Sequence, residues 1–291
     1  MRVCYLGSGE TMPGSPNRRG DAFEHDQMMD ALGAAFRSKD AILEDKSWDE
    51  DGVDWSSFDA VIIGTTWDYP ERLDEFLAVL EKIATQTKLF NSPDLVVWNS
   101  HKTYLRDLEY KGVSTVPTLW LDKVTCENAA HAFDRLSSEI LVFKQQVGAN
   151  AGGQYKLKAD DMIPDMPEPM MVQPFLKSIQ DEGEISFIFI DGNFCHAVQK
   201  KPVKGEYRIQ SSYGGIETEY VPLGHDIACA QSVLEMIDFD MPLYARVDMV
   251  RGSDGGLCVM ELEMVEPFLY PVQGPELGTK IYQAIEKRLL T

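Results

Sequence analysis

The segment 243–267, with the sequence LYARVDMVRGSDGGLCVMELEMVEP, constrains the fold of this chain more than any other feature. It contains two runs in which bulky apolar residues alternate with other residues, and a period of two predicts β-strands. The glycine-rich stretch between the runs is typical of a tight turn, so the two strands should form an antiparallel hairpin. Pairing Val250 with Leu257 across the turn places Asp248 opposite Val259.

In that register the charged side chains of the hairpin share one face. They are Arg246, Asp248, Glu261 and Glu263. The opposite face is apolar, and Met260 and Leu262 are expected to pack there into a core. Neighbouring carboxylates repel one another and are costly to desolvate unless a cation lies among them. The hairpin therefore predicts a bound cation, for which a metal ion is the first candidate.

Length and charge narrow the class of protein. The 291 residues suggest about two domains, and no apolar run approaches a membrane span. Met1 is followed directly by strand-like residues, so no signal peptide is expected. The five cysteines are scattered and form no CxxC pair, which predicts reduced thiols and a cytoplasmic protein. A net charge of -20 argues against binding to nucleic acid or to anionic membranes. An anionic ligand would therefore need lysines, arginines or metals that reverse the field locally.

Residues 1–98 alternate strand-like and helical patterns, which predicts an α/β domain with a parallel sheet and ligands at the carboxyl ends of its strands. The expected strands are 2–6, 41–45, 58–66 and 88–93, and the expected helices are 22–36 and 72–86.

Residues 99–291 predict a second block with an α+β pattern. A helix should begin at its cap Ser100 and end at Gly112. It is followed by strand-like pieces, by a hairpin that turns at 191–193, and by helices at 225–237 and 276–290. The proline-rich segment 162–171 is expected to connect subdomains.

The motifs for dinucleotides and nucleoside triphosphates are weak or missing. Gly7 and Gly9 follow the first strand, but the third glycine of a dinucleotide-binding fingerprint comes late, at Gly14, beside prolines that disfavour a helix start. There is no GxxxxGK[ST] motif, and the five histidines are scattered rather than paired. A dehydrogenase is therefore a weak third hypothesis.

Several lysines stand in unusual places. Lys144 ends a strand and precedes the small-residue loop 145–153, whose backbone N–H groups could hold phosphates. The alternative is a strand-end lysine that reaches solvent beside a plain mobile loop. The basic residues Lys200, Lys201 and Arg208 precede the acidic hairpin, where they form either simple ion pairs or part of a phosphate and metal site.

The order of these features resembles the ATP-grasp superfamily of carboxylate–amine ligases. More narrowly, segments such as NSPDLVVWNSHKTYLRDLEYKG, HAVQKKPVKGEYRIQSSYGG and VMELEMVEPFLY resemble the cycloserine synthetase (O-ureido-D-serine cyclo-ligase) and glutathione-synthetase-like branch. The likeness covers nearly the whole chain from about Val53, and the first fifty residues match loosely. It implies an N-terminal parallel-sheet pre-ATP-grasp domain (1–98) and an ATP-grasp domain (99–291). The latter would divide into a lid subdomain of about 113–170 and a metal and substrate subdomain of about 171–291.

The resemblance also implies roles for individual residues. ATP phosphates would be held by Lys102, Lys144 and the loop glycines Gly148, Gly152 and Gly153. Adenine would lie against Gln173, Pro174, Phe175 and Leu176, with ribose at Glu182 or Glu184. Two Mg²⁺ ions, for which Mn²⁺ can substitute, would be held by Asp248, Glu261 and Glu263. Arg208 with Lys200 or Lys201 would lie near the transferred phosphate, and the acceptor would contact Thr66, Trp67, Asp68, Tyr69 and Glu266. For Asp68, a simple helix cap before Pro70 is the alternative.

Two positions depart from the family pattern. Gly64 stands where this branch is expected to have a basic residue, and Gln145 follows Lys144 where many relatives have proline. The first departure bears on the identity of the substrate, whereas the second should not affect ATP binding.

The implied activity is an ATP- and Mg²⁺-dependent ligation of a small amino-acid-like carboxylate to an amine through an acyl phosphate, either between two molecules or by ring closure. The partners would be small molecules rather than nucleic acid or membrane, in a homo-oligomeric (dimeric or tetrameric) cytoplasmic enzyme. The alternative is a non-catalytic ATP-binding regulatory protein with the same fold, in which some metal ligands would be expected to be lost.

Overall fold

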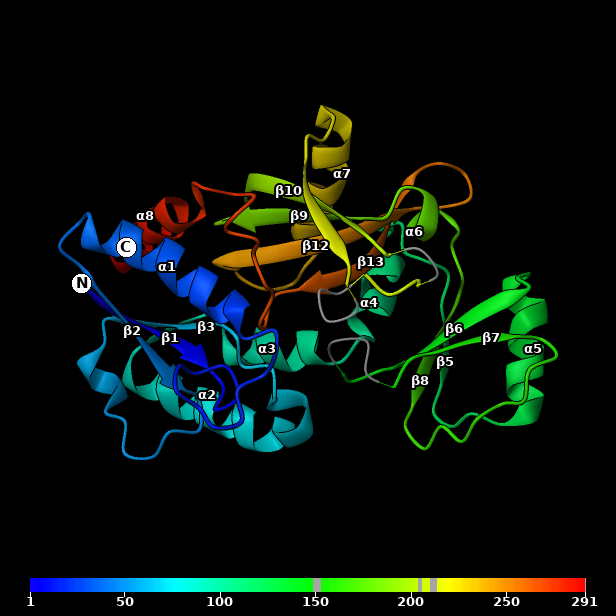
Figure 1. The fold of residues 1–291 in the computed structure, drawn as a ribbon, viewed down its shortest axis with the longest axis horizontal. Helices are drawn as coiled ribbons and strands as arrows, with labels where there is room; N and C mark the ends of the chain where they lie inside the picture. Colours follow the sequence, from blue (N-terminus) through cyan, green and yellow to red (C-terminus); the bar gives the residue numbers. More distant parts are fainter. Residues whose placement is uncertain (149–152, 204–205, 210–213, 291) are drawn as a thin grey trace.

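A computed structural model describes residues 1–148, 153–203, 206–209 and 214–290 (Figure 1). Three β-sheets form its scaffold: a parallel sheet near the N-terminus, a central antiparallel sheet, and a small antiparallel sheet at the far end of the long axis. This mixed α/β architecture agrees with the fold class expected from the sequence.

The N-terminal sheet has the strand order β2-β1-β3-β4, and all its pairs are parallel. Its strands are β1 (Arg2–Gly7), β2 (Ile42–Ser47), β3 (Ala60–Ile63) and β4 (Lys88–Phe90). Its helices are α1 (Phe23–Arg37) and α2 (Leu73–Gln86), with the 3₁₀ turns η1 (Trp55–Ser57) and η2 (Tyr69–Arg72). Alternate residues of β1 pack on opposite faces, Val3 and Tyr5 toward α1 and Cys4 and Leu6 toward α2.

The helix expected from Ser100 to Gly112 is preceded by a helix that was not expected. α3 (Pro93–Ser100) begins with Ser92, whose hydroxyl accepts a hydrogen bond from Leu95 N, and with proline in its first turn. Ser100 is therefore the last residue of α3 and not the cap of the next helix, and its hydroxyl donates to Val97 O at 3.0 Å. The second helix, α4 (Tyr104–Tyr110), begins four residues later than expected.

The central sheet has the order β11-β10-β9-β12-β13. Its strands are β9 (Glu184–Ile190), β10 (Asn193–Lys201), β11 (Ile216–Tyr220), β12 (Tyr244–Arg251) and β13 (Leu257–Glu263). Apolar residues of α4 and α7 (Gly224–Glu235) pack on one face of this sheet. Part of the other face packs against α1 and the C-terminal α8 (Leu277–Leu289), which joins the central sheet to the N-terminal domain (Figure 1).

The β12–β13 hairpin forms as predicted, but its register differs. A β-bulge shifts the pairing, so Met249 pairs with Val259 whereas Asp248 pairs with Glu261. The strict alternation assumed from the sequence therefore breaks at Met260. Val259 packs in the core between the central sheet and the helices α4 and α7. Met260 lies on the opposite face of the sheet together with Glu261, where both line a cleft. The expectation that Met260 packs in the main core was wrong, and the bulge brings Asp248 and Glu261 directly opposite each other.

The outer edge of β13 is held by side chains from α3 and α4. Asn99 donates to Leu262 O and accepts from Met264 N, both at 2.8 Å, and the hydroxyl of Tyr104 accepts from Leu262 N at 3.0 Å. These bonds satisfy backbone groups that a neighbouring strand would otherwise pair. They fix the direction in which Glu261 and Glu263 project.

Leu262 should be essential for the stability of this hairpin, because it is 1% exposed and packs between β12 and α4. Leu262→Asp is expected to lower the free energy of unfolding by about 3 kcal/mol or more, since it buries an unpaired carboxylate. The matched Leu262→Met should cost less than about 1.5 kcal/mol. Urea unfolding followed by circular dichroism measures both, and equal midpoints for the two variants would mean that Leu262 does not lie in a closed core.

The third sheet has the order β5-β8-β6-β7. Its strands are β5 (Leu119–Leu121), β6 (Ile140–Gln145), β7 (Tyr155–Lys158) and β8 (Met170–Pro174), and α5 (Cys126–Leu136) packs on one face. The short α6 (Ser178–Asp181) follows β8. The proline-rich segment 162–171 links β7 to β8 and so lies within this sheet; the expectation that it connects subdomains was wrong. β8 belongs to this third sheet, named the lid sheet below after the expected lid subdomain, although residue 171 was expected to begin the next subdomain.

None of the helices in the described ranges is both long enough and apolar enough to cross a membrane.

Candidate active site

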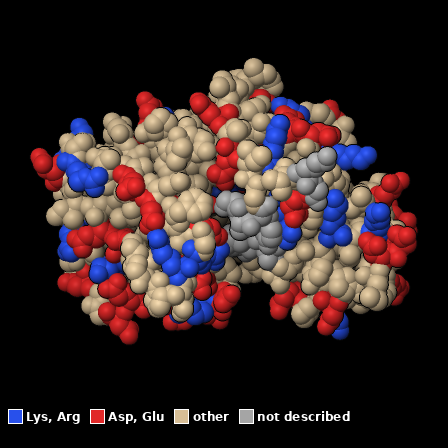
Figure 2. Space-filling model, in the orientation of Figure 1, with Lys and Arg blue, Asp and Glu red and all other residues tan. Residues whose placement is uncertain are grey.

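A cleft with a volume of about 210 Å³ lies where the central sheet, the lid sheet and the N-terminal domain meet. Acidic side chains are spread over the visible face of the molecule, in keeping with its net charge (Figure 2). The cleft is also lined by acidic residues, but five basic side chains lie among them. They are Lys102, Lys144, Lys200, Arg208 and Arg246.

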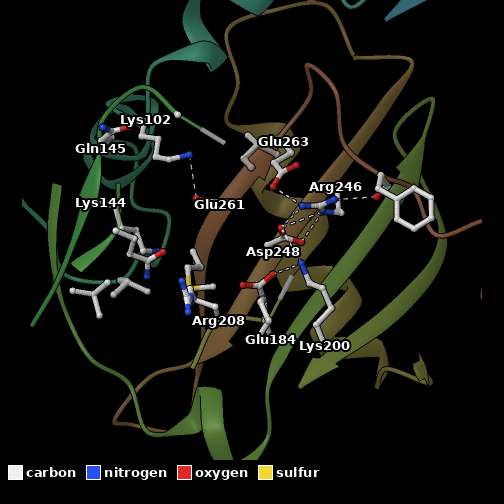
Figure 3. Close-up of a pocket in the computed structure, with 18 of the residues that line it drawn as sticks. Lys102, Lys144, Gln145, Glu184, Lys200, Arg208, Arg246, Asp248, Glu261 and Glu263 are labelled. Carbon is white, nitrogen blue, oxygen red and sulfur yellow. Dashed lines mark hydrogen bonds and ion pairs between the residues drawn. The ribbon is translucent and has the colours of Figure 1, made fainter. Parts of the chain in front are cut away.

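The three carboxylates of the hairpin converge in this cleft. Asp248 projects from β12, and Glu261 and Glu263 project from β13 (Figure 3). One oxygen atom of each lies within 4.8 Å of the others. All the donors are hard carboxylate oxygens, and no histidine or cysteine takes part, so the set fits Mg²⁺ or Mn²⁺ better than zinc.

Side-chain cations also lie among these carboxylates. Arg246 pairs with Asp248 at 2.9 Å and with Glu263, Lys200 approaches Asp248 at 3.4 Å, and Lys102 reaches Glu261 at 3.1 Å (Figure 3). The positive charge that was predicted among the hairpin carboxylates is thus supplied in part by basic side chains of the protein. Any metal ion must share the carboxylates with these groups.

These pairs separate the pKa values of the carboxyl groups. Burial acts to raise the pKa of Glu261, but the ammonium groups of Lys102 and Lys144 outweigh it and lower that pKa to about 2. Burial likewise opposes ionisation of Asp248, whose pKa Arg246 nevertheless lowers to about 2. For Glu263 burial dominates and raises the pKa to about 7. The carboxyl groups of Asp248 and Glu261 are therefore ionised at neutral pH.

Lys144 faces these carboxylates from β6 of the lid sheet (Figure 3). Val142 and Lys144 point into the cleft, whereas Leu141 and Phe143 pack toward α5, as the period of two requires. Within the described ranges Lys144 has no hydrogen bond or ion pair, and burial lowers its pKa. A half-buried ammonium group without an anion is suited to a phosphate ligand.

The loop after β6 is only partly described. Gly148 lines the cleft. Gly153, with φ at 61°, does not, and Gly152 lies outside the described residues.

The four expected hinge residues, 173–176, all line the cleft. Gln173 is 3% exposed and donates from Nε2 to Thr118 Oγ1 at 2.9 Å, and Phe175 N donates to Ile140 O at 2.9 Å. Around them lies an apolar wall formed by Val116, Val142, Ile179, Ile209 and Met260. A flat apolar base such as adenine could lie between these groups.

Two acidic residues expected at the ribose occupy different surroundings. Glu184 is 3% exposed, lines the cleft and pairs with Lys200, and burial raises its pKa to about 8. Glu182 lies outside the cleft lining and pairs with Arg251 at 2.9 Å. The structure therefore separates them, because Glu182 is the C-cap residue after α6 whereas Glu184 begins β9.

Three further expected residues do not line the cleft. Lys201 is adjacent to Lys200 on β10, so it points to the opposite face of the strand. Thr66 is fully buried, with a hydroxyl that has no partner in the described part of the chain. Asp68 accepts hydrogen bonds from Trp48 Nε1 at 2.7 Å and Arg72 Nη2 at 2.8 Å.

Asp68 stands at the N-cap position of η2, but its side chain makes no capping hydrogen bond. Neither the substrate role nor the simple cap describes it. Through Trp48 and Arg72 it holds the segment that carries Trp67 and Tyr69, both of which line the cleft.

Arg208 lines the cleft and pairs with Glu206 at 2.6 Å. Arg246, in contrast, was not assigned a role from the sequence, although it lies two residues before Asp248 and so on the same face of β12. It is 7% exposed and also donates from Nη1 to Phe268 O at 3.0 Å. The two-residue spacing between Arg246 and Asp248 was the sequence signal that could have identified Arg246 as a site residue.

The N-terminal domain contributes more to the cleft than expected. Trp67, Tyr69 and Glu266, which were expected to contact the acceptor, line the cleft, and Asp21 and Glu24, at the start of α1, line it as well. They follow the carboxyl end of β1, which is where ligands bind in parallel sheets, but no local motif marks them.

Gly64 is required by the packing of Tyr5. A Cβ atom at position 64 would lie 2.1 Å from the Tyr5 ring, so no larger residue fits while that ring, 3% exposed, keeps its place. The departure from a basic residue at this position is therefore coupled to Tyr5.

Comparison with known proteins agrees with this architecture. The family described as "D-cycloserine synthetase DcsG, N-terminal domain" matches residues 5–91. Cycloserine biosynthesis protein DcsG of Streptomyces lavendulae is 29% identical over 246 residues, which cover 76% of this chain and 80% of the relative. Glutathione synthetase of Bradyrhizobium diazoefficiens is 22% identical over 224 residues, 72% of this chain and 67% of the relative.

Solved structures extend the likeness to the whole chain. The crystal structure of D-cycloserine synthetase DcsG matches with a TM-score of 0.83 at 25% identity, covering 99% of this chain and 100% of that chain. D-Alanine–D-alanine ligase from Bacillus anthracis, complexed with ATP, shares the fold with a TM-score of 0.69 at 16% identity, covering 100% of this chain and 97% of that chain. These likenesses support the ATP-grasp fold and relate the chain to the ATP-grasp ligases of the cycloserine synthetase type.

Proposed function

We propose that this enzyme is an ATP- and Mg²⁺-dependent carboxylate–amine ligase that acts through an acyl phosphate on a small amino-acid-like acid, with ring closure as one form of the reaction. One observation carries the proposal: the ammonium group of Lys144, which has no partner among the described residues, faces three converging carboxylates across a cleft with an apolar end. A triphosphate with divalent metals is the ligand that joins these two groups.

The nucleotide would lie along the cleft from the hinge to the hairpin. Adenine would take the apolar wall beside Phe175 and Leu176, and Lys144 and Lys102 would bind phosphate oxygens. Lys102 would have to leave Glu261 in order to do so. Glu184, which is paired with Lys200, lies on the metal side of the cleft, so we do not assign it to ribose.

Asp248, Glu261 and Glu263 would hold the Mg²⁺ ions. These ions would offset the negative charge on the transferred phosphoryl group. The chain's own residues then position the acid. In the first step a carboxylate oxygen of the acid attacks the γ-phosphorus, the bond to the β-phosphate oxygen breaks, and ADP leaves. In the second step an amine attacks the acyl carbon, the bond to the phosphate oxygen breaks, and phosphate leaves as the amine loses a proton.

Arg246 and Arg208 would stabilise the negative charge that develops in these steps. Arg246 is fixed by Phe268 O and two carboxylates, so its guanidinium group needs little reorganisation. No nucleophilic side chain is needed, because positioning and charge stabilisation account for most of the catalysis in phosphoryl transfer.

The two other hypotheses have weaker support. Among the described residues, Gly7 and Gly9 do not line the cleft, so a dinucleotide site there has no cavity. A non-catalytic regulator would not need all three carboxylates to converge with five cations around them. The direct test is an ADP-release screen over small amino-acid carboxylates, with and without amines. The proposal would be contradicted if none of the acids in the panel caused ADP release, or if the protein showed NADH-dependent turnover.

Mg-ATP is expected to stabilise the protein much more than ATP alone, because bare phosphates would face three carboxylates. At 100 times the dissociation constant the gain is about 2.7 kcal/mol, which corresponds to a rise in melting temperature of about 5 °C. A thermal-shift series with ATP, Mg-ATP and NADH measures it. Stabilisation by NADH and none by Mg-ATP would rule out this nucleotide site.

A further inference from the structure

The segment after β13 places an aromatic ring beside the charged groups of the cleft. Tyr270 lines the cleft and is 4% exposed. The centroid of its ring lies 5.6 Å from Cζ of Arg246 and 5.8 Å from Nζ of Lys200, and both cations lie over the ring. The face of an aromatic ring is electron-rich and attracts a cation within about 6 Å of its centroid. Tyr270 therefore interacts with two cations of the candidate site at once.

Arg246 and Lys200 carry like charges and share one carboxylate oxygen. Arg246 Nη2 lies 2.9 Å and Lys200 Nζ lies 3.4 Å from Oδ2 of Asp248 (Figure 3). Cations this close repel each other, and their remaining ion-pair partners, Glu263 and Glu184, are carboxylates as well. A bound metal ion would compete for such oxygens, whereas a neutral ring attracts both cations without occupying a carboxylate.

Phe268 connects the ring to Arg246 from the side. The rings of Phe268 and Tyr270 pack edge to face, with centroids 4.8 Å apart, and the carbonyl of Phe268 accepts from Arg246 Nη1 at 3.0 Å. The guanidinium group is thus held by the backbone of the same short segment that presents the Tyr270 ring.

The backbone of Tyr270 is strained in a way that fixes the ring. Its φ is 51°, in the left-handed region where bulky side chains are rarely found. The carbonyl of Tyr270 accepts hydrogen bonds from Gln273 N at 3.1 Å and Gly274 N at 3.0 Å, which close the following turn. A Cβ atom on Gly274 would lie 2.2 Å from the His196 ring, so the turn packs directly on β10, the strand of Lys200. Backbone strain that the surrounding structure maintains is concentrated at functional sites.

We propose that Tyr270 is a positioning residue, whose ring face holds the guanidinium group of Arg246 and the ammonium group of Lys200 in place for charge stabilisation. Among the described residues none forms a hydrogen bond with its hydroxyl group, so the ring is the part that acts. Tyr270 acts through these two cations and not on the transferred group. The effect on turnover rests on the proposed ligase function, whereas the restraint on Arg246 does not.

Three replacements of Tyr270 separate the ring face from the packing. Tyr270→Phe keeps the ring, so kcat for ADP release should stay within about twofold. A trifluorinated phenylalanine at position 270 keeps the shape but withdraws the negative charge of the face, so kcat should fall about tenfold while the dissociation constant for Mg-ADP stays within about threefold. Tyr270→Leu should lose at least as much turnover. If that variant does not fold, the fluorinated one still decides.

The matched control is Tyr282→Leu. Tyr282 belongs to the same apolar cluster, is 5% exposed and packs edge to face on Phe36 at 5.1 Å, but it lies outside the cleft lining. Its loss should lower the melting temperature about as much as Tyr270→Leu and leave kcat within about twofold.

A second measurement does not depend on turnover. Nε of Arg246 donates to Asp248 at 3.0 Å, so the exchange of this N–H group with solvent, followed by NMR, reports how firmly the guanidinium group is held. Its signal is assigned by its loss in Arg246→Lys. Exchange should be about tenfold faster in Tyr270→Leu and in the fluorinated variant, and unchanged in Tyr270→Phe and Tyr282→Leu.

Unchanged exchange in the fluorinated variant would overturn the inference. An equal loss of turnover in Tyr270→Phe or in Tyr282→Leu would overturn it too, because the hydroxyl group or general packing would then be responsible. Faster exchange in a protein that releases no ADP with any acid would uphold the positioning role and count instead against the proposed ligase function.

Discussion

Lys144→Ala is expected to weaken ATP binding by between about 10-fold and 150-fold and to remove most ADP release, because it deletes a charge–phosphate contact worth about 1.5–3 kcal/mol. The size of the effect follows from the surroundings of the residue. Lys144 is half-buried and has no anion of its own in the described structure, so its interaction with a phosphate is not weakened by a competing ion pair. Calorimetric titration with Mg-ADP and an ADP-release assay measure the two effects.

The control must be a lysine of the same sheet outside the cleft. Lys156 is not suitable, because its Nζ lies 3.5 Å from the centroid of the Phe175 ring and so supports the hinge. Lys158, exposed at the end of β7, is the better choice. Lys158→Ala should leave both measurements within twofold of the unmodified enzyme. Equal losses from Lys144→Ala and Lys158→Ala would mean that the phosphates bind elsewhere.

The fold was predictable where periodicity was strong and local. The helices expected at 22–36 and 276–290 were found at Phe23–Arg37 and Leu277–Leu289, because each buries one continuous face against the other and the sheet. The weaker predictions failed near capping signals that were overlooked. Ser92 before Pro93 begins α3, and Thr125 with Asn128 forms the capping box of α5, a helix that was not predicted.

The bulge in β13 could not be found from the alternating pattern. Val259, Met260 and Glu261 fit an uninterrupted strand equally well in sequence, and only the pairing of β13 with β12 selects the extra residue. The consequence is functional, because the bulge sets Glu261 opposite Asp248 and turns Met260 into the wall of the cleft.

The residues of the candidate site also differ in how far they could be predicted from the sequence. Residues of one hairpin could be grouped from the sequence, because the period of two and the pairing of the strands place Asp248, Glu261 and Glu263 on one face. Residues brought by the meeting of separate elements could not. Lys102 contacts Glu261 only because α3 and α4 pack along β13, and Asp21 reaches the cleft only because β1 ends beside β3.

Glu261→Gln is the second change with a large expected effect. It should reduce ADP release roughly 100-fold or more, because a neutral amide holds Mg²⁺ poorly and about 3 kcal/mol of charge stabilisation would be lost. Repulsion among neighbouring carboxylates, considered alone, would make this variant more stable than the unmodified protein in the absence of metal. The structure reverses that expectation, because Glu261 is the partner of Lys102 at 3.1 Å and lies near Lys144. We therefore expect the metal-free variant to be less stable by about 1–2 kcal/mol.

The matched control is Glu44→Gln, which removes a strand carboxylate paired with Arg2 at 2.7 Å outside the cleft. Both variants lose one ion pair, so both should show a small fall in melting temperature without metal. Only Glu261→Gln should lose ADP release and weaken Mn²⁺ binding in the presence of ADP, because only Glu261 lies within 4.8 Å of two other carboxylate ligands. A Glu261→Gln protein that keeps its ADP release but is much less stable would identify Glu261 as a structural partner of Lys102. In that case Asp248 and Glu263 alone would have to hold the metal ions.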